Sequence, residues 1–227
     1  MRQYIVISTG SQQNYLCHHG VLGMKWGVWN DETRARRLAS SISSKAQRKE
    51  HQITKDIAKA ADLSGSKMYG LEHKLKTPES ITRKIITDSE EKHISKEQAA
   101  KEIKDAVRYT TIQNNKNFVR SYFKTKELLE RLGYKEVRCK NYFEDYKKGL
   151  VKHKSVQSVF QDASGYLFEI QFQTPESQEA KDKKTPIYEE RRTPGISELR
   201  KTELEAMMTN LMDPVPYPDD IEKIKSH

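Results

Sequence analysis

The sequence has little of what membrane spans, disulfide frameworks and metal fingers require. No apolar run reaches the roughly 18 residues of a membrane-spanning helix, so we expect no membrane partner. The two cysteines, Cys17 and Cys139, lie far apart and lack metal-finger spacing, which fits a reducing compartment better than a disulfide scaffold. The start, MRQYIVISTG, is too short and polar for a secretory signal. We therefore expect a cytoplasmic protein, with delivery by a signal-independent route left open.

Apolar residues are also scarce. Only 35% of the 227 residues are hydrophobic, 32% are charged, and the mean hydropathy is -0.89. This composition cannot fill a core that runs through the whole chain, so we expect one compact domain with solvated helical flanks. Lys and Arg total 41 against 32 acidic residues, for a formal charge of +9. The excess favours a polyanionic partner such as a nucleotide, RNA or DNA, without choosing among them.

Residues 1–30 differ from the rest, because glycines separate large side chains in CHHGVLGMKWGVW. Cys17, His18 and His19 are adjacent, and no distant cluster completes a metal site, so a structural turn is the simpler interpretation. The string HHGVLGMKWGV resembles a short segment of proteins encoded by bacteriophages and prophages of Gram-positive bacteria. The resemblance implies a bacterial or phage-infected host cell as the setting.

The next segment, 31–65, predicts a charged helical extension. Its sparse apolar stripe runs from Leu38 to Ile57, and Gly65 follows in a short boundary sequence. Such a helix serves as a solvated arm, a partner-binding surface or a packing strut, and its basic residues also allow an RNA-binding arm.

Residues 66–193 alternate between helical and strand patterns and form the main predicted domain. The order favours an α+β fold, with a mixed β-sheet of about four to five strands flanked by helices. Residues 194–227 add a C-terminal helix (196–212) and a loosely structured tail. Within the domain we expect helices at 66–73, 78–87, 95–106, 118–132 and 176–192, and strands at 107–112, 135–143, 155–161 and 167–172.

The last of these strands carries an unusual carboxylate. Glu169, Gln171 and Gln173 share one face of the strand, and Phe168 and Ile170 lie on the other. A carboxylate in mid-strand is disfavoured unless it is solvated, paired or bound to a cation. Glu169 is therefore a candidate metal ligand or general base, with a structural residue on an exposed sheet face as the alternative.

A second group of chemistry-bearing residues lies in HKLKTPESITRK. Thr77 is a good N-cap and Pro78 a good first helical residue, so several cations gather at a helix start that itself attracts anions. The segment predicts a triphosphate-binding site, with a solvated basic helix as the alternative. The candidate residues are Lys74, Lys76, Ser80, Arg83 and Lys84.

Two further sites complete the set. Asp105 precedes a predicted strand. There it and Glu169 could share a Mg²⁺ ion, and phosphate oxygens would complete the coordination of that ion. In KNYFEDYKKG, aromatic rings suit base stacking and lysines suit phosphates, although packing in a core is also common for such rings. These residues are Lys140, Tyr142, Tyr146 and Lys147.

In this order, the segments resemble the synthetase domain of RelA/SpoT-like enzymes, which include small alarmone synthetases and related toxins. The family pattern is R-x-K-x-x-x-S-x-x-x-K, then an Asp before a strand, then K-D-Y-I with a G-Y motif, then E-x-Q-x-R-T. The resemblance covers about residues 69–192. It implies transfer of pyrophosphate from ATP to a nucleotide or to the 3′ end of a tRNA, with Mg²⁺. It places Glu169, Asp105 and Gln171 in the catalytic set.

The chain departs from the family pattern at several positions. Lys74 replaces an Arg, Asn141 an Asp and Gln173 an Arg, and the stretch after Tyr146 lacks the family's His. These departures leave the identity of the acceptor more open than the identity of ATP as the donor. Together with the phage-like start, the resemblance predicts a toxin or defence effector. An antitoxin, an immunity protein or a phage component would then be its protein partner.

Two other functions fit parts of the sequence. Arg108, Ser155 and Glu169 form the arginine-serine-glutamate set of an ADP-ribosyltransferase-type toxin. A non-catalytic phage structural or nucleic-acid-binding protein would explain the basic helix and the lost motif residues.

Overall fold

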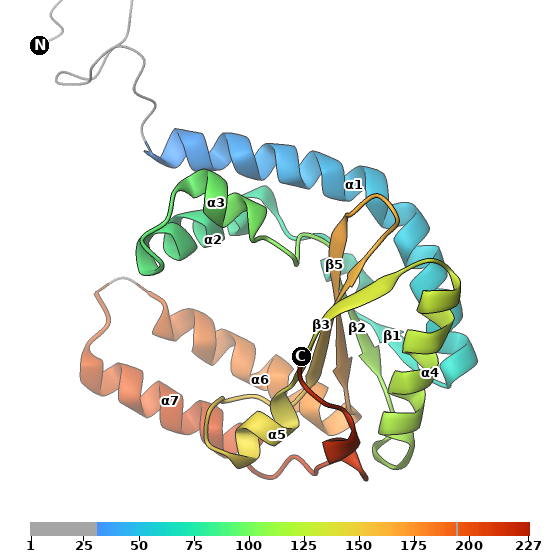
Figure 1. Ribbon diagram of the computed structural model, residues 1–227. Helices are drawn as coiled ribbons and strands as arrows, with labels where there is room; N and C mark the ends of the chain where they lie inside the picture. Colours follow the sequence, from blue (N-terminus) through green and yellow to red (C-terminus); the bar gives the residue numbers. More distant parts are fainter. Residues whose placement is uncertain (1–30, 194) are drawn as a thin grey trace, which may run out of the picture.

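The structure is a computed structural model that describes residues 31–193 and 195–227, so the phage-like segment lies outside the described residues. Its centre is a mixed five-stranded sheet in the order β1-β2-β5-β4-β3, which confirms the α+β prediction (Figure 1). β2 and β5 are parallel, and the other neighbouring strands are antiparallel. The strands are β1 (Lys67–Tyr69), β2 (Arg108–Ile112), β3 (Lys135–Asn141), β4 (Val156–Gln161) and β5 (Leu167–Gln173).

Helices cover both faces of this sheet. Figure 1 shows α4 and the second half of α1 on one side of the strands, and α6 and α7 on the other. None of the helices in the described ranges has the length and apolar character needed to cross a membrane. The helices are α1 (Asp31–Ser64), α2 (Pro78–Glu91), α3 (Lys96–Lys101), α4 (Phe118–Arg131), α5 (Tyr142–Lys147), α6 (Pro175–Arg191) and α7 (Glu198–Met212).

The hydrophobic core lies on the α1 and α4 side of the sheet. Phe168, Ile170 and Phe172 of β5 are fully buried there, and the Phe172 ring meets Tyr122 of α4 edge-on at 5.0 Å. Alternation along the strand turns Glu169 away from this core, toward the face on which α6 lies. The sheet thus has one apolar face and one polar face, as the pattern of residues 167–172 predicts.

Helix α1 is a packing element of this core. Its buried residues include Ala39, Ala46, Ile53 and Ile57, and they belong to the same cluster as the β5 phenylalanines. Small residues let the helix approach the sheet closely, while charged residues such as Arg36 and Arg48 stay exposed to solvent. Of the roles that the sequence allowed for this helix, the structure shows the packing strut.

Residues 66–73 differ from the prediction of a short helix. Residues 67–69 form the edge strand β1, in which Met68 pairs with Thr111 of β2. Gly70 then adopts a left-handed conformation (φ 61°) that a side chain would disfavour, and the chain turns into a short 3-10 helix at Leu71–His73. Met68 and Thr111 are 43 positions apart in the sequence, and pairing with so distant a strand outweighs the local helical pattern.

The C-terminal tail also differs from the prediction, because it is packed rather than loose. Ile221 and Ile224 are buried in the main core. The backbone of the last residue, His227, exchanges two hydrogen bonds with Cys139 of β3, at 2.9 and 3.1 Å. The tail therefore covers part of the exposed edge of β3, where unpaired backbone groups would otherwise remain.

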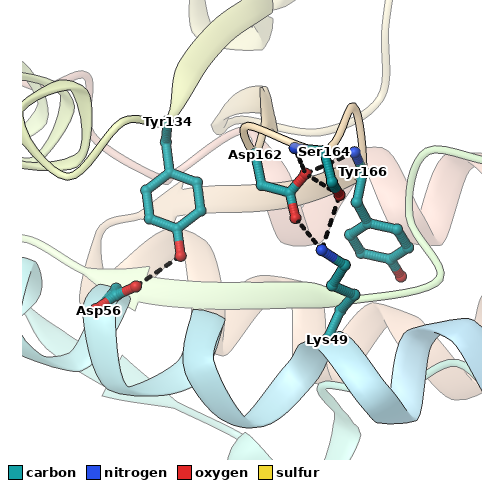
Figure 2. A network of polar contacts seen from close by, with 6 residues as sticks. All are labelled: Lys49, Asp56, Tyr134, Asp162, Ser164 and Tyr166. Carbon is teal, nitrogen blue, oxygen red and sulfur yellow. Dashed lines mark hydrogen bonds and ion pairs between the residues drawn. The ribbon is translucent and has the colours of Figure 1, made fainter.

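A polar network ties the β4–β5 turn to α1 (Figure 2). Lys49 of α1 donates to Asp162 Oδ2 at 2.7 Å and to the Ser164 hydroxyl at 2.8 Å. The other Asp162 oxygen accepts the backbone N–H groups of Ser164 and Tyr166, which closes the turn. Nearby, the Tyr134 hydroxyl donates to Asp56 of α1 at 2.6 Å. These contacts fix the hairpin that leads into β5, and so they help to position Glu169.

We expect Asp162→Asn to destabilise the fold at neutral pH, by on the order of 2 kcal/mol. Burial alone would raise the pKa of Asp162, but the hydrogen bonds from Lys49, Ser164 and the turn backbone lower it to about 2. The carboxylate is therefore stabilising above its ordinary pKa of 3.8, and this contribution is lost as the pH falls toward 2. Urea unfolding should show the difference from wild type at pH 7 and little difference near pH 2. Equal stability of the two proteins at pH 7 would contradict this account.

Candidate active site

The polar face of the sheet centres on Glu169. Because β2 and β5 are parallel and in register, Arg108 lies beside Glu169, and Thr110 lies beside Gln171. On the other side, Val159 of β4 pairs with Glu169. A strand with hydrogen-bonded neighbours on both sides holds its side chains rigidly. Glu169 is only 6% exposed, so it is a buried carboxylate at a fixed position.

Glu169 is the end of a hydrogen-bonded chain. Gln171 Nε2 donates to Glu169 Oε1 at 2.7 Å, and Lys181 Nζ of α6 donates to Gln171 Oε1 at 2.7 Å. Burial and the nearby charge of Arg108 lower the pKa of Lys181 to about 8. The chain links the centre of the sheet to the helix that covers its polar face.

A second group of charges surrounds Asp105, just before β2. Lys76 Nζ donates to Asp105 Oδ2, and Lys84 Nζ lies 3.6 Å from Asp105 Oδ1. Burial by itself would raise the pKa of Asp105, but Lys76, Lys84 and Arg108 hold it below its usual value. The pKa of Lys76 is lowered, because its burial outweighs the attraction of Asp105. Asp105 Oδ1 is buried and accepts no hydrogen bond, and Lys84 is the cation that faces it.

Backbone pairing brings this group to β2. The Lys76 N–H donates to the Ala106 carbonyl, and the Arg108 N–H donates to the Lys74 carbonyl. Residues 74–76 therefore extend the sheet edge beside the entrance to β2, and α2 starts directly afterwards with Thr77 as its N-cap. The basic segment and Asp105 are neighbours for this reason, although about 30 residues separate them in the sequence.

The structure does not bring all five predicted phosphate-binding residues together. Lys76 and Lys84 meet at Asp105, but Lys74 pairs with Glu50 of α1 at 2.9 Å. Arg83 lies 3.7 Å from Glu189 and so connects α2 to α6. The Ser80 N–H donates to the Thr77 side chain in the first turn of α2.

The predicted acceptor residues also divide into two groups. The Tyr142 ring packs on His153 with centroids 4.2 Å apart. Burial raises the pKa of Tyr142, and the nearby charges of Arg138 and Glu169 act on it in opposite directions. Lys140 pairs with Gln157 of β4, the neighbour of Gln171. These groups border Glu169 on the side opposite Arg108.

Tyr146 and Lys147 instead engage the chain after α7. The Tyr146 hydroxyl donates to Asp213 at 2.6 Å, and Lys154 Nζ lies 4.6 Å from the centre of the Tyr146 ring. Lys147 pairs with Glu144 and lies over the Tyr217 ring at 4.9 Å. Their contacts hold α5 against the tail.

Two of the departures from the family pattern have structural roles here. Asn141 is buried and donates to the carbonyl groups of Ile221 and Ile224 at 2.8 and 2.9 Å, which fastens the C-terminal tail. Gln173 accepts the Ser177 hydroxyl at 2.6 Å at the start of α6. Both side chains are therefore engaged in contacts within the fold.

Sequence reasoning missed three residues beside the site: Lys181, His153 and Arg138. The helix that carries Lys181 was expected, but its buried residues, Ser177, Gln178 and Ala180, form no apolar stripe that would mark the inward face. The alternation of β3 could have placed Arg138 on the face of Lys140. Nothing in the sequence marks His153.

The described part of the chain has no group of three or more His, Cys, Asp or Glu side chains that could hold a metal by themselves. Magnesium, however, is commonly bound by one or two carboxylates while substrate phosphates complete its octahedron. Asp105, whose Oδ1 atom accepts no hydrogen bond, and the buried Glu169 have the chemistry of such ligands. Four cations (Lys76, Lys84, Arg108 and Lys181) accompany these two carboxylates, so the site has a positive excess that suits a polyphosphate.

A separate surface hollow of about 530 Å³ lies at the end of α1 and along α4. Leu63, Arg120, Phe123 and Lys124 are among its lining residues. Since α4 packs on the apolar face of the sheet, this hollow is distinct from the site at Glu169.

Comparison with known proteins gave one sequence match and several structural ones. Residues 9–32 match a family of unknown function (DUF7211). No curated protein matches the chain.

The similar solved structures include the Type VI effector Tas1, crystallised with its immunity protein (16% identity, TM-score 0.45). That match covers 82% of this chain and 96% of the other. Small alarmone synthetase 1 from Bacillus subtilis, bound to its product pppGpp, has 16% identity and a TM-score of 0.45, and covers 78% and 87%. Small alarmone synthetase 2 from Bacillus subtilis has 15% identity and a TM-score of 0.47, and covers 81% and 90%. These likenesses have TM-scores below 0.5 and concern the course of the chain, not its chemistry.

Proposed function

We propose that this chain is an ATP-dependent pyrophosphokinase, which transfers pyrophosphate from ATP to a hydroxyl group of a nucleotide or to the 3′ end of a tRNA. One observation carries the proposal. Segments 74–84 and 105–108 meet where Lys76 and Lys84 form ion pairs with Asp105, and the parallel pairing of β2 with β5 places Arg108 beside Glu169 of segment 169–171. These are the segments on which the resemblance to the RelA/SpoT-like synthetases rests.

In this proposal, Lys76, Lys84 and Arg108 bind the ATP phosphates. Their excess of positive charge offsets the charge of a triphosphate, and partial burial strengthens each interaction. Lys74, Ser80 and Arg83 are proposed for the outer part of the same site, since α2 begins between them. Nucleotide binding would compete with the ion pairs that Lys74 and Arg83 make with Glu50 and Glu189.

The reaction needs a base and a leaving group. The acceptor oxygen attacks the β-phosphorus of ATP, the bond from that phosphorus to the α,β-bridging oxygen breaks, and AMP leaves with the electron pair. The proton of the acceptor hydroxyl passes to the Glu169 oxygen that Gln171 does not occupy. Asp105, together with phosphate oxygens of ATP, would hold Mg²⁺, which when bound would neutralise charge on the transferred group.

The acceptor would lie on the opposite side of Glu169. Tyr142 and its partner His153 offer an aromatic surface for a base or sugar, and Lys140 offers a charge for a phosphate. Tyr146 and Lys147 lie farther out in this proposal, where a large acceptor such as tRNA would extend. With the phage-like sequence of residues 1–30, this supports a toxin or defence effector. An antitoxin, an immunity protein or a phage component is the protein partner we propose.

The test is to incubate the purified chain with ATP, Mg²⁺ and, separately, GDP, GTP, AMP and tRNA, and to identify products by mass spectrometry. We expect AMP to form in the same amount as an acceptor that carries two additional phosphate groups. No AMP with any acceptor would refute the proposal. Transfer from labelled NAD would instead favour an ADP-ribosyltransferase, and salt-dependent RNA or DNA binding without turnover would favour a non-catalytic protein.

A further inference from the structure

Lys181 has no counterpart in the motifs that point to the site, yet it contacts the catalytic strand. Its ammonium group donates to Gln171 at 2.7 Å, and Gln171 in turn donates to Glu169. We propose that Lys181 is a positioning residue that orients Glu169 through Gln171. This inference rests on the proposed function, because it assumes that Glu169 takes the proton.

The first argument is the direction of the hydrogen bonds. A lysine ammonium group has three donors and no acceptor, so it can bind only the oxygen end of the Gln171 amide. That bond forces the NH₂ end toward Glu169 Oε1. Without Lys181, the amide could turn over and place its oxygen against the carboxylate, which would repel it. Gln171 alone could hold its amide in either orientation, and the hydrogen bond from Lys181 selects the one that points the NH₂ group at Glu169.

The second argument is that α6 is itself held firmly over β5. At its start, the Thr174 and Ser177 side chains form a capping box, and the Ser177 hydroxyl also donates to Gln173 of β5. One turn later, Asp182 accepts hydrogen bonds from Tyr69 of β1 and from Gln178. Lys181 lies between these two attachments, so its Nζ atom has a defined position relative to Gln171.

The consequence concerns the carboxylate. Gln171 occupies Oε1 of Glu169, and rotation of the carboxylate would break that bond. Oε2 is then the oxygen left for the acceptor proton, at a direction set by the strand and by the amide. Misplacing a catalytic group by about 1 Å can cost on the order of 100-fold in rate. A residue that never touches the substrate can therefore have a large effect.

The test is a double-mutant cycle of Lys181→Met and Gln171→Leu, measured in the pyrophosphate-transfer assay. We expect Lys181→Met to lower kcat by about 10- to 100-fold, with less than about a 3-fold change in KM for ATP. In the Gln171→Leu background, the same substitution should have almost no further effect. Lys181→Arg keeps a donor and should restore part of the loss. Lys183→Met removes the same charge from the same helix, but Lys183 pairs with the exposed Glu179, so kcat should be unchanged.

Two outcomes would overturn the proposal: equal losses from Lys181→Met in both backgrounds, which would mean direct action on the substrate, or no loss at all. A second measurement does not need activity. In NMR spectra, the side-chain amide signals of Gln171, assigned with Gln171→Leu, should shift in Lys181→Met and not in Lys183→Met. If these signals shift in a chain that transfers no pyrophosphate, the Lys181–Gln171 contact stands and the proposed function fails. If they do not shift, the positioning role fails whatever the activity.

Discussion

Glu169→Gln is expected to lower the rate of pyrophosphate transfer by about 10³-fold while ATP binding changes by only a few-fold. Glutamine has nearly the same shape, so it fits the same buried position beside Gln171. It cannot accept the proton of the acceptor hydroxyl, and loss of a general base typically costs on the order of 10² to 10⁴ in rate. The lysines and Arg108 that we propose to bind the phosphates are unchanged, so the loss should appear in kcat rather than in ATP affinity.

The matched control is Glu179→Gln, the same chemical change on the solvent side of α6, where the exposed Glu179 forms an ion pair with Lys183. Its kcat should equal that of wild type. Thermal unfolding of both variants tests whether either change acts through the fold. Full transfer by a folded Glu169→Gln variant with every acceptor would remove Glu169 from the mechanism.

Asp105→Asn should also inactivate the protein, by about 100-fold at saturating Mg²⁺, but through a different property. Asp105 is bound to Lys76 and lies 3.6 Å from Lys84, so in the proposed site it would compete with ATP phosphates for these lysines. Removing its charge should leave ATP binding unchanged or tighter in the absence of Mg²⁺. It should also abolish the gain in ATP affinity that Mg²⁺ provides. Titration calorimetry with and without Mg²⁺ separates the two effects.

Lys76→Met is the matched opposite of Asp105→Asn, because it removes the other half of the same pair. We expect it to weaken ATP binding by about 10-fold whether or not Mg²⁺ is present. If Asp105→Asn weakened ATP binding in the same way, Asp105 would serve only to hold the lysines in place. The metal role of Asp105 would then be wrong.

Local signals predicted most of the secondary structure. The alternation of residues 167–172 predicted both faces of β5, and Thr77 with Pro78 predicted the start of α2. The predictions that failed concern contacts between segments that are far apart in the sequence. Residues 66–73 form a strand and a turn because β2 pairs with them, and the tail after residue 212 packs because Ile221 and Ile224 reach the core. A single sequence does not reveal which distant segment will supply such partners.

The site was predicted in pieces rather than as an arrangement. The sequence indicated Glu169, Asp105, Lys76 and Lys84, and the structure brings the last three of these together. The sequence could not show that Lys74 turns toward α1, because the ion pair with Glu50 depends on where α1 lies in the fold. Nor could it show that Lys181 faces inward, since α6 has no apolar stripe to mark its buried side.

The most direct test of the central claim uses ATP labelled separately at the β- and γ-phosphorus. A pyrophosphokinase moves both atoms together, so the acceptor should gain the two labels in equal amounts while AMP is released. Transfer of the γ-label alone would show an ordinary phosphoryl transferase. Transfer of neither label to a nucleotide or to tRNA would contradict the account of this site.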